Sequence, residues 1–263
     1  MLLGHFCLEG LPHERFRAAA AAGFTGVSLF WQEVAARRQH EGDLGGCRQE
    51  LLAAGIGAPV MEYIPLPTRQ ELPGFAAHAA EIANVSADLG CVIVQAVALG
   101  LGTPVEVLVE GLGVLAHACA NARLKCVVEF VPFITSLPDL RSAVELVHAV
   151  DRNNVGLLID SMHFFRSGAP WHELDALDVE VMVAQVNDAP LRRPSDDYGL
   201  ECMTMRCLPG DGEFDLTRFI RTLKRISPGA LWMAEVVNSE LLAMPGARAA
   251  TLIAEKTRWL DER

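Results

Sequence analysis

The feature that most constrains the fold is a repeated unit of a helical segment, a glycine or asparagine stop, and a short apolar run. One copy runs from a helical segment at Phe75–Leu89 through Gly90 into an apolar run at Cys91–Val97. Glycine and asparagine supply the left-handed residue that closes a helix before the next strand. Strands that alternate with helices predict parallel pairing through right-handed crossovers. The expected strands are Leu3–Leu8, Thr25–Trp31, Ile56–Glu62, Cys91–Val97, Lys125–Val131, Val155–Asp160, Val181–Asn187 and Leu231–Val237.

Eight such units in a chain of 263 residues predict an α/β fold, a (β/α)₈ TIM barrel that forms a single domain over residues 1–263. The alternative is an open, doubly wound sheet. That fold usually carries a glycine-rich phosphate turn after its first strand, and Gly4-His5-Phe6 is not such a turn. The longest irregular stretch, Asn187–Asp211, is expected to be a lid or a substrate loop.

The composition limits the classes of partner that the chain is expected to bind. Hydrophobic residues make up 51% of the chain, and 22 Lys and Arg against 33 Asp and Glu give a net charge of −11. An acidic chain is not expected to bind nucleic acid or an anionic membrane, because both require a basic face. The most apolar region, Cys91–Ala120, is interrupted by polar residues and proline, so no membrane span is expected. Seven cysteines without a CxxC pair, and no basic signal region in Met1–Gly10, indicate reduced thiols in a cytoplasmic protein.

Oxygen-bearing side chains stand at the carboxyl ends of the four later strands: Glu129, Asp160, Gln185 and Glu235. In a parallel barrel these ends form the catalytic rim. A carboxylate in a buried strand costs several kcal/mol unless it is paired or binds a metal. Four such groups on neighbouring strands predict a divalent-cation site, and hard oxygen ligands favour Mg²⁺ or Mn²⁺ over zinc. The alternative is a purely structural polar network.

The motifs around these residues resemble those of the xylose isomerase-like TIM barrels, also described as sugar phosphate isomerases/epimerases. The resemblance covers nearly the whole chain. It rests on Val127-Val128-Glu129-Phe130, Leu158-Ile159-Asp160-Ser161-Met162-His163, Gln185-Val186-Asn187-Asp188-Ala189-Pro190, Arg206-Cys207-Leu208-Pro209-Gly210-Asp211-Gly212-Glu213 and Ala234-Glu235-Val236.

The resemblance implies that Glu129, Asp160, Gln185 and Glu235 hold one divalent cation. Many family members have histidine at the position of Gln185, and the glutamine variant is similar to the branch that contains bacterial 3-dehydroshikimate dehydratases. The implied chemistry is removal of a carbon-bound proton from a small keto-sugar or hydroxy-carbonyl compound through a metal-stabilised enediolate. Return of the proton gives isomerisation or epimerisation, which we rank first. Loss of a β-hydroxyl gives dehydration, ranked second because residues around Glu62–Arg69 depart from the dehydratase pattern.

His163 is the first candidate for acid–base catalysis, since imidazole titrates near neutral pH. The alternative is that it only orients Asp160. Glu129 and Glu235 are further catalytic candidates, because paired glutamates exchange protons in related epimerases.

Three more residues are expected to contact substrate: Arg206, Glu62 and His5. Arg206 could bind a carboxylate, phosphate or hydroxyl group of the substrate. The alternative for Arg206 is a surface ion pair with an acid of its own loop, namely Asp196, Asp197 or Glu201.

Other classes fit less well. DNA-repair endonucleases share this barrel but rely on several zinc ions, histidine ligands and a basic groove. A non-catalytic binding barrel is a further alternative, but it would not require an intact set of metal ligands. Of the three lysines, Lys125 opens its strand and Lys224 and Lys256 lie in helical segments, so none stands at the carboxyl end of a strand, which disfavours a Schiff-base aldolase. The expected partner is therefore a small-molecule substrate; a homo-oligomer is compatible with the sequence, which does not fix the number of subunits.

Overall fold

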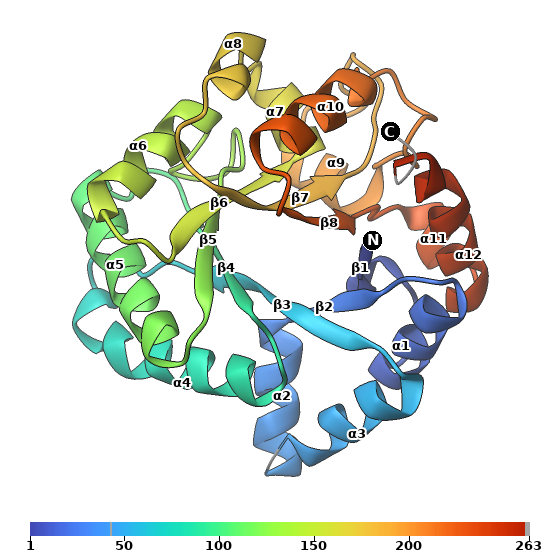
Figure 1. Ribbon diagram of the computed structural model, residues 1–263, viewed down its shortest axis with the longest axis horizontal. Helices are drawn as coiled ribbons and strands as arrows, with labels where there is room; N and C mark the ends of the chain where they lie inside the picture. Colours follow the sequence, from blue (N-terminus) through green and yellow to red (C-terminus); the bar gives the residue numbers. More distant parts are fainter. Residues whose placement is uncertain (43, 261–263) are drawn as a thin grey trace. The chain divides into compact units, whose positions relative to one another are not determined.

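The computed structural model describes residues 1–42 and 44–260 (Figure 1). Within that part of the chain the strands are β1 (Leu2–Gly4), β2 (Gly26–Phe30), β3 (Gly57–Pro65), β4 (Ile93–Val97), β5 (Lys125–Glu129), β6 (Val155–Asp160), β7 (Val181–Val186) and β8 (Leu231–Ala234). They are hydrogen-bonded in chain order and close into a barrel. This confirms the predicted (β/α)₈ fold. The expected domain, 1–263, includes residues 43 and 261–263, which lie outside the described residues, and the single domain stays a prediction.

Helices follow the strands, as the repeated unit predicts. They are α1 (Pro12–Ala21), α2 (Trp31–Glu41), α3 (Gly45–Ala54), α4 (Phe75–Asp88), α5 (Val105–Asn121), α6 (Leu140–Val150), α7 (Ser161–Ser167), α8 (Trp171–Asp175), α9 (Tyr198–Thr204), α10 (Leu216–Ile226), α11 (Ser239–Leu242) and α12 (Gly246–Thr257). Short 3₁₀ turns are η1 (His5–Cys7), η2 (Leu72–Gly74) and η3 (Arg258–Leu260). No helix among the described residues is long and apolar enough to cross a bilayer.

Contacts divide the chain into two compact units. Unit one comprises Met1–Ala58, Asp160–Met162 and Ala184–Arg263, and unit two comprises Pro59–Ile159 and His163–Val183. In unit one, β1 pairs in parallel with β2 and with β8, and α1 packs against α12 and α3. In unit two, β3, β4, β5 and β6 pair in parallel, and α5 packs between α4 and α6 (Figure 1).

The apolar runs are buried because barrel strands are covered on both faces. All residues of β4, β6 and β7 are buried. Helix ends also follow the expected chemistry, since Gly42 and Gly55 close α2 and α3 with positive φ angles of 81° and 67°.

Among the described residues, only β6 has the expected bounds at both ends, and the differences that bear on the site lie at three strands and one loop. The first strand ends at Gly4, so His5 lies in η1 rather than in a strand. The last strand ends at Ala234, so Glu235 follows β8 instead of lying within it. β3 continues to Pro65, past a register shift between Met61 and Ile64. The irregular stretch expected at Asn187–Asp211 contains helix α9.

Candidate metal centre

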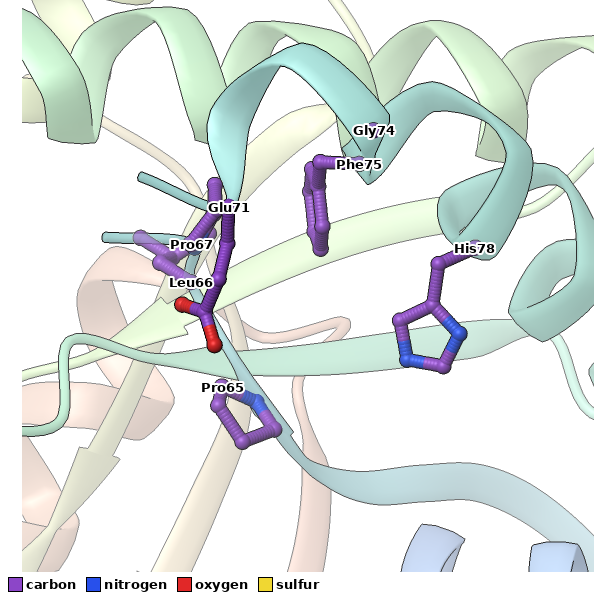
Figure 2. Close-up of a pocket in the computed structure, with 7 residues that line it drawn as sticks. All are labelled: Pro65, Leu66, Pro67, Glu71, Gly74, Phe75 and His78. Atoms are coloured by element: carbon purple, nitrogen blue, oxygen red, sulfur yellow. The ribbon is translucent and has the colours of Figure 1, made fainter. Parts of the chain in front are cut away.

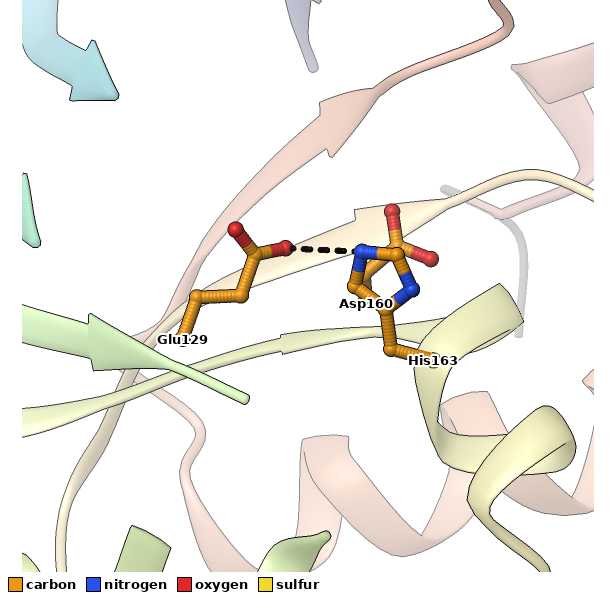
Figure 3. A group of neighbouring side chains, drawn as sticks. All are labelled: Glu129, Asp160 and His163. Atoms are coloured by element: carbon orange, nitrogen blue, oxygen red, sulfur yellow. Dashed lines mark ion pairs between the residues drawn. The ribbon is translucent and has the colours of Figure 1, made fainter. Parts of the chain in front are cut away.

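Three buried side chains meet where β5 and β6 end (Figure 3). Glu129 is the last residue of β5, Asp160 is the last residue of β6, and His163 lies in α7, which begins directly after Asp160. Each offers one ligand atom, and these atoms lie within 4.8 Å of one another. The Nε2 atom of His163 lies 3.4 Å from Oε1 of Glu129. The group therefore has the residue types and the spacing to hold a divalent cation.

Asp160 is also held by hydrogen bonds from several donors. The Nδ2 atom of Asn187 donates to both carboxylate oxygens, at 3.0 and 2.9 Å, and the backbone N–H of Met162 donates to Oδ1 at 2.6 Å. Hydrogen bonds to both oxygens fix the orientation of the carboxylate. The Oδ1 atom of Asn187 is buried and has no hydrogen-bond partner among the described residues.

Arg206 is buried beside two of the expected metal ligands. Its Nη1 atom donates to Oδ2 of Asp160 at 2.7 Å, and its Nη2 atom lies 3.5 Å from Oε1 of Glu235. Burial would lower the pKa of the guanidinium, but the carboxylates of Glu235 and Asp160 outweigh burial and raise that pKa well above its usual value. Arg206 thus neutralises part of the negative charge that these carboxylates bring into the interior.

The alternative of a surface ion pair between Arg206 and its own loop is wrong, because Arg206 is only 3% exposed. A different arginine, Arg193, forms the ion pair with the loop residue Glu201. The Nε atom of Arg193 donates to Oε2 of the buried Glu201 at 2.9 Å, and the guanidinium lies over the ring of Tyr198. Helix α9 itself holds Arg206, since the backbone oxygen of Cys202 accepts a 2.8 Å hydrogen bond from its Nε atom.

Gln185 and Glu235, the other two expected ligands, are both buried in unit one. Gln185 lies in β7, and its Nε2 atom contacts the sulfur of Met233 at 3.9 Å. Glu235 follows β8 and faces Arg206. Unit one thus brings Asp160, Arg206 and Glu235 together, whereas ligation of one ion by all four predicted residues stays a prediction.

Gln95 contacts this centre and was missed as a site residue. It lies in β4, is 2% exposed, and donates from Nε2 to Oε2 of Glu129 at 2.6 Å. In the sequence it is noticed only as a polar interruption of an apolar region. A lone amide in a run of buried strand residues is a signal that could have found it, because buried polar groups require partners.

The two remaining predicted residues are buried, His5 directly after β1 and Glu62 within β3. The Nδ1 atom of His5 lies 2.5 Å from the backbone oxygen of Ser28, and its Nε2 atom lies 2.7 Å from Oε2 of Glu33. Both ring nitrogens therefore have protein partners, and substrate contact by His5 stays a prediction. Glu62 is buried within β3, and its contact with substrate is likewise untested.

A separate pocket of about 290 Å³ lies in unit two, where β3 leads into α4 (Figure 2). Its walls are mostly apolar, and one carboxylate and one imidazole stand in them. The lining residues are Pro65, Leu66, Pro67, Glu71, Gly74, Phe75 and His78. None of the predicted site residues lines it, so we assign it no part in the candidate metal centre.

Comparison with known proteins identifies a family and several relatives of this chain. Residues 16–263 match the protein family described as a xylose isomerase-like TIM barrel. A 3-dehydroshikimate dehydratase of Pseudomonas aeruginosa is 28% identical over 268 residues, which is 95% of this chain and 41% of the relative. An inosose isomerase of Bacillus subtilis is 30% identical over 158 residues, which is 58% of this chain and 52% of the relative.

The chain spans about two fifths to one half of the length of these two relatives. Among solved structures, a crystal structure described as an IOLI protein with a binding zinc atom superposes with a TM-score of 0.87 at 17% identity. That superposition covers 98% of this chain and 96% of the other. At this level of identity the similarity supports the barrel fold.

Proposed function

Because the chain belongs to the xylose isomerase-like TIM barrel family, we propose that it is a divalent-metal-dependent enzyme that removes a carbon-bound proton from a small hydroxy-carbonyl compound. The observation that carries this proposal is the buried group of Glu129, Asp160 and His163, whose ligand atoms lie within 4.8 Å of one another. Burying two carboxylates and an imidazole together destabilises the folded state unless they share a cation or a proton. The same groups are suited to general acid–base catalysis.

We propose Glu129, Asp160, Gln185 and Glu235 as the metal ligands. Three carboxylates and an amide are hard oxygen donors, which favour Mg²⁺ or Mn²⁺. A cation held there supplies Lewis-acid stabilisation of negative charge that develops on substrate oxygens. The fit is supported by the burial of all four side chains. Arg206 already contacts Asp160 and Glu235, so these two would share their negative charge between the guanidinium and the ion.

His163 is the proposed acid–base residue. Its Nε2 atom faces Oε1 of Glu129, so a proton taken by the imidazole would remain beside a carboxylate that stabilises it. Glu129 and Glu235 are proposed as the pair that moves protons on either side of the reacting carbon. Arg206 is fixed at both Nε and Nη1, and we propose that its guanidinium orients an anionic or hydroxyl group of the substrate. Substrate contacts by Glu62 and His5 are part of the same proposal.

Two reactions follow from the same proton removal. Return of the proton gives an isomerase or epimerase, and this is supported by the inosose isomerase similarity over 58% of the chain. Loss of water gives a dehydratase, and this is supported by similarity to 3-dehydroshikimate dehydratase over 95% of the chain. The longer match and the buried arginine favour dehydration, so the dehydratase reaction is the one to test first. The proposed compartment is the cytoplasm, since an odd number of cysteines without a CxxC pair is typical of reduced thiols.

The deciding experiment offers the Mn²⁺-loaded and the Mg²⁺-loaded protein 3-dehydroshikimate, inosose and a panel of ketoses in D₂O. A dehydratase would produce a new aromatic product with strong ultraviolet absorbance. An isomerase or epimerase would return sugar or inosose that carries solvent deuterium, detected by mass spectrometry. His163→Ala should lower either rate about 10²- to 10⁴-fold, the range expected for loss of one acid–base group.

An exposed histidine provides the matched control. His117→Ala, on the outer helix α5, should leave the rate unchanged. If neither product nor deuterium appears with a metal-loaded, folded sample, or if His163→Ala reacts as fast as the wild type, the proposed chemistry is wrong.

A further inference from the structure

Gln95 is the one polar residue in the buried strand β4, whose neighbours in the strand are Ile93, Val94, Ala96 and Val97. A buried amide must have partners for its oxygen and its nitrogen, because an unmet polar group in the interior is costly. The partners of Gln95 come from the two strands on either side of β4, which are β3 and β5. Its side chain therefore joins three neighbouring strands of unit two.

On the β3 side, the Oε1 atom of Gln95 accepts a hydrogen bond from the backbone N–H of Tyr63. Tyr63 has a φ of 65°, a left-handed conformation that is rare for a bulky aromatic residue. It lies within the register shift between Met61 and Ile64, where the regular pairing of β3 with β4 is interrupted. A strained backbone of this kind persists only where the surrounding structure enforces it. Here it aims one N–H group at Gln95.

On the β5 side, the Nε2 atom of Gln95 donates to Oε2 of Glu129 at 2.6 Å. The Tyr63 N–H can only donate, so it fixes which end of the amide is oxygen and which is nitrogen. The nitrogen end must then face Glu129. This contact occupies one carboxylate oxygen and leaves the other, Oε1, facing His163 at 3.4 Å (Figure 3).

We propose that Gln95 is a positioning residue that holds the Glu129 carboxylate so that its Oε1 atom is presented to the metal and to His163. The inference rests on the proposed function, because it requires Glu129 to be a metal ligand. Mutation of a residue that orients a metal ligand through a hydrogen bond typically costs about 10- to 100-fold in metal affinity or activity. Gln95 would act through Glu129 and not by touching the substrate.

The test compares wild type, Gln95→Met, Gln95→Asn and Ser86→Ala for binding of Mn²⁺ alone. Methionine matches the length of glutamine but cannot donate, whereas asparagine keeps an amide that is too short to reach both partners. Ser86 is a control because it is a fully buried polar residue of unit two that lies in helix α4, outside the site. Calorimetry gives the Mn²⁺ dissociation constant, and electron paramagnetic resonance reports the symmetry of the bound ion.

We expect Gln95→Met to weaken Mn²⁺ binding about 10- to 100-fold and to change the resonance spectrum, with Gln95→Asn weakened in the same direction. Ser86→Ala should bind within about twofold of wild type. If Gln95→Met does not fold, Gln95→Asn decides the question. Equal Mn²⁺ affinity and equal spectra in wild type and the folded variants would overturn the inference and leave the proposed function standing.

The remaining outcomes separate the two proposals. Weaker binding by the Gln95 variants, together with no turnover of any offered substrate by wild type, supports the inference and contradicts the proposed reaction. Absence of Mn²⁺ binding by the wild-type protein overturns both.

Discussion

At the residue scale, Asp160 shows most clearly what a sequence can and cannot predict. Its place at the end of a strand could be predicted, because the apolar run directly before it marks the strand and both are local in the sequence. Its ion pair with Arg206 joins residues 46 positions apart, and no periodicity links them. The same limit applies to Gln95, which contacts Glu129 across 34 positions. The polar residues at the strand ends could therefore be identified from the sequence, but not the side chains that contact them.

Arg206 provides a prediction for stability. Arg206→Leu would leave the carboxylates of Asp160 and Glu235 buried beside an apolar side chain. Breaking a buried ion pair by removing one partner costs about 3–5 kcal/mol. We expect a loss of that size in the free energy of unfolding, measured with urea in the presence of a chelator.

The exposed Arg192 is the matched control, and Arg192→Leu should change the free energy of unfolding by no more than about 0.5 kcal/mol. Equal stability of the two variants would mean that Arg206 does not compensate the buried carboxylates.

At the element scale, the order and type of the helices and strands were predictable, whereas several ends were not. The apolar residues Val236 and Val237 extend the last hydrophobic run beyond β8, so the sequence places Glu235 inside a strand that in fact ends at Ala234. Similarly, β1 ends where the chain turns into η1, and His5 leaves the strand to contact Ser28 and Glu33. Hydrophobicity marks what is buried, but strand ends depend on backbone pairing with neighbours.

The contacts of Glu33 connect η1, α1 and α2 and give a pH-dependent prediction. Burial would raise the pKa of Glu33, but hydrogen bonding to His5 and the charges of His5 and Arg15 together lower it below its usual value of 4.5. A lowered pKa in the folded state stabilises the fold above the unfolded-state value, and this contribution is lost as pH falls through the folded-state value. Wild type should therefore be more stable than Glu33→Gln at pH 7.

Urea unfolding at a series of pH values measures this difference. The advantage of wild type over Glu33→Gln should shrink as pH falls below about 4.5, the ordinary value for glutamate. An advantage that stays constant from pH 7 to pH 3 would show that the carboxylate charge of Glu33 is not responsible.

At the scale of the whole molecule, the repeated helix–stop–strand unit was sufficient to predict the (β/α)₈ barrel. The fold requires each strand to be apolar on both faces and each helix to end before the next strand, and both requirements are visible along the chain. The reaction is not determined at this scale, because isomerases, epimerases and dehydratases of this kind share the first proton removal. Substrate choice depends on side chains around the rim of the barrel. The positions of these side chains follow no sequence period, so the substrate could not be predicted from the repeated unit.

The most direct test of the account is a calorimetric titration of the metal-free protein with Mn²⁺, for wild type and for Glu129→Gln and Asp160→Asn. We expect wild type to bind one ion per chain, and each variant to bind at least about 100-fold more weakly, since each would lose a charged ligand. Wild type that binds no ion, or variants that bind Mn²⁺ as tightly as wild type, would contradict the central claim that Glu129 and Asp160 belong to a metal centre.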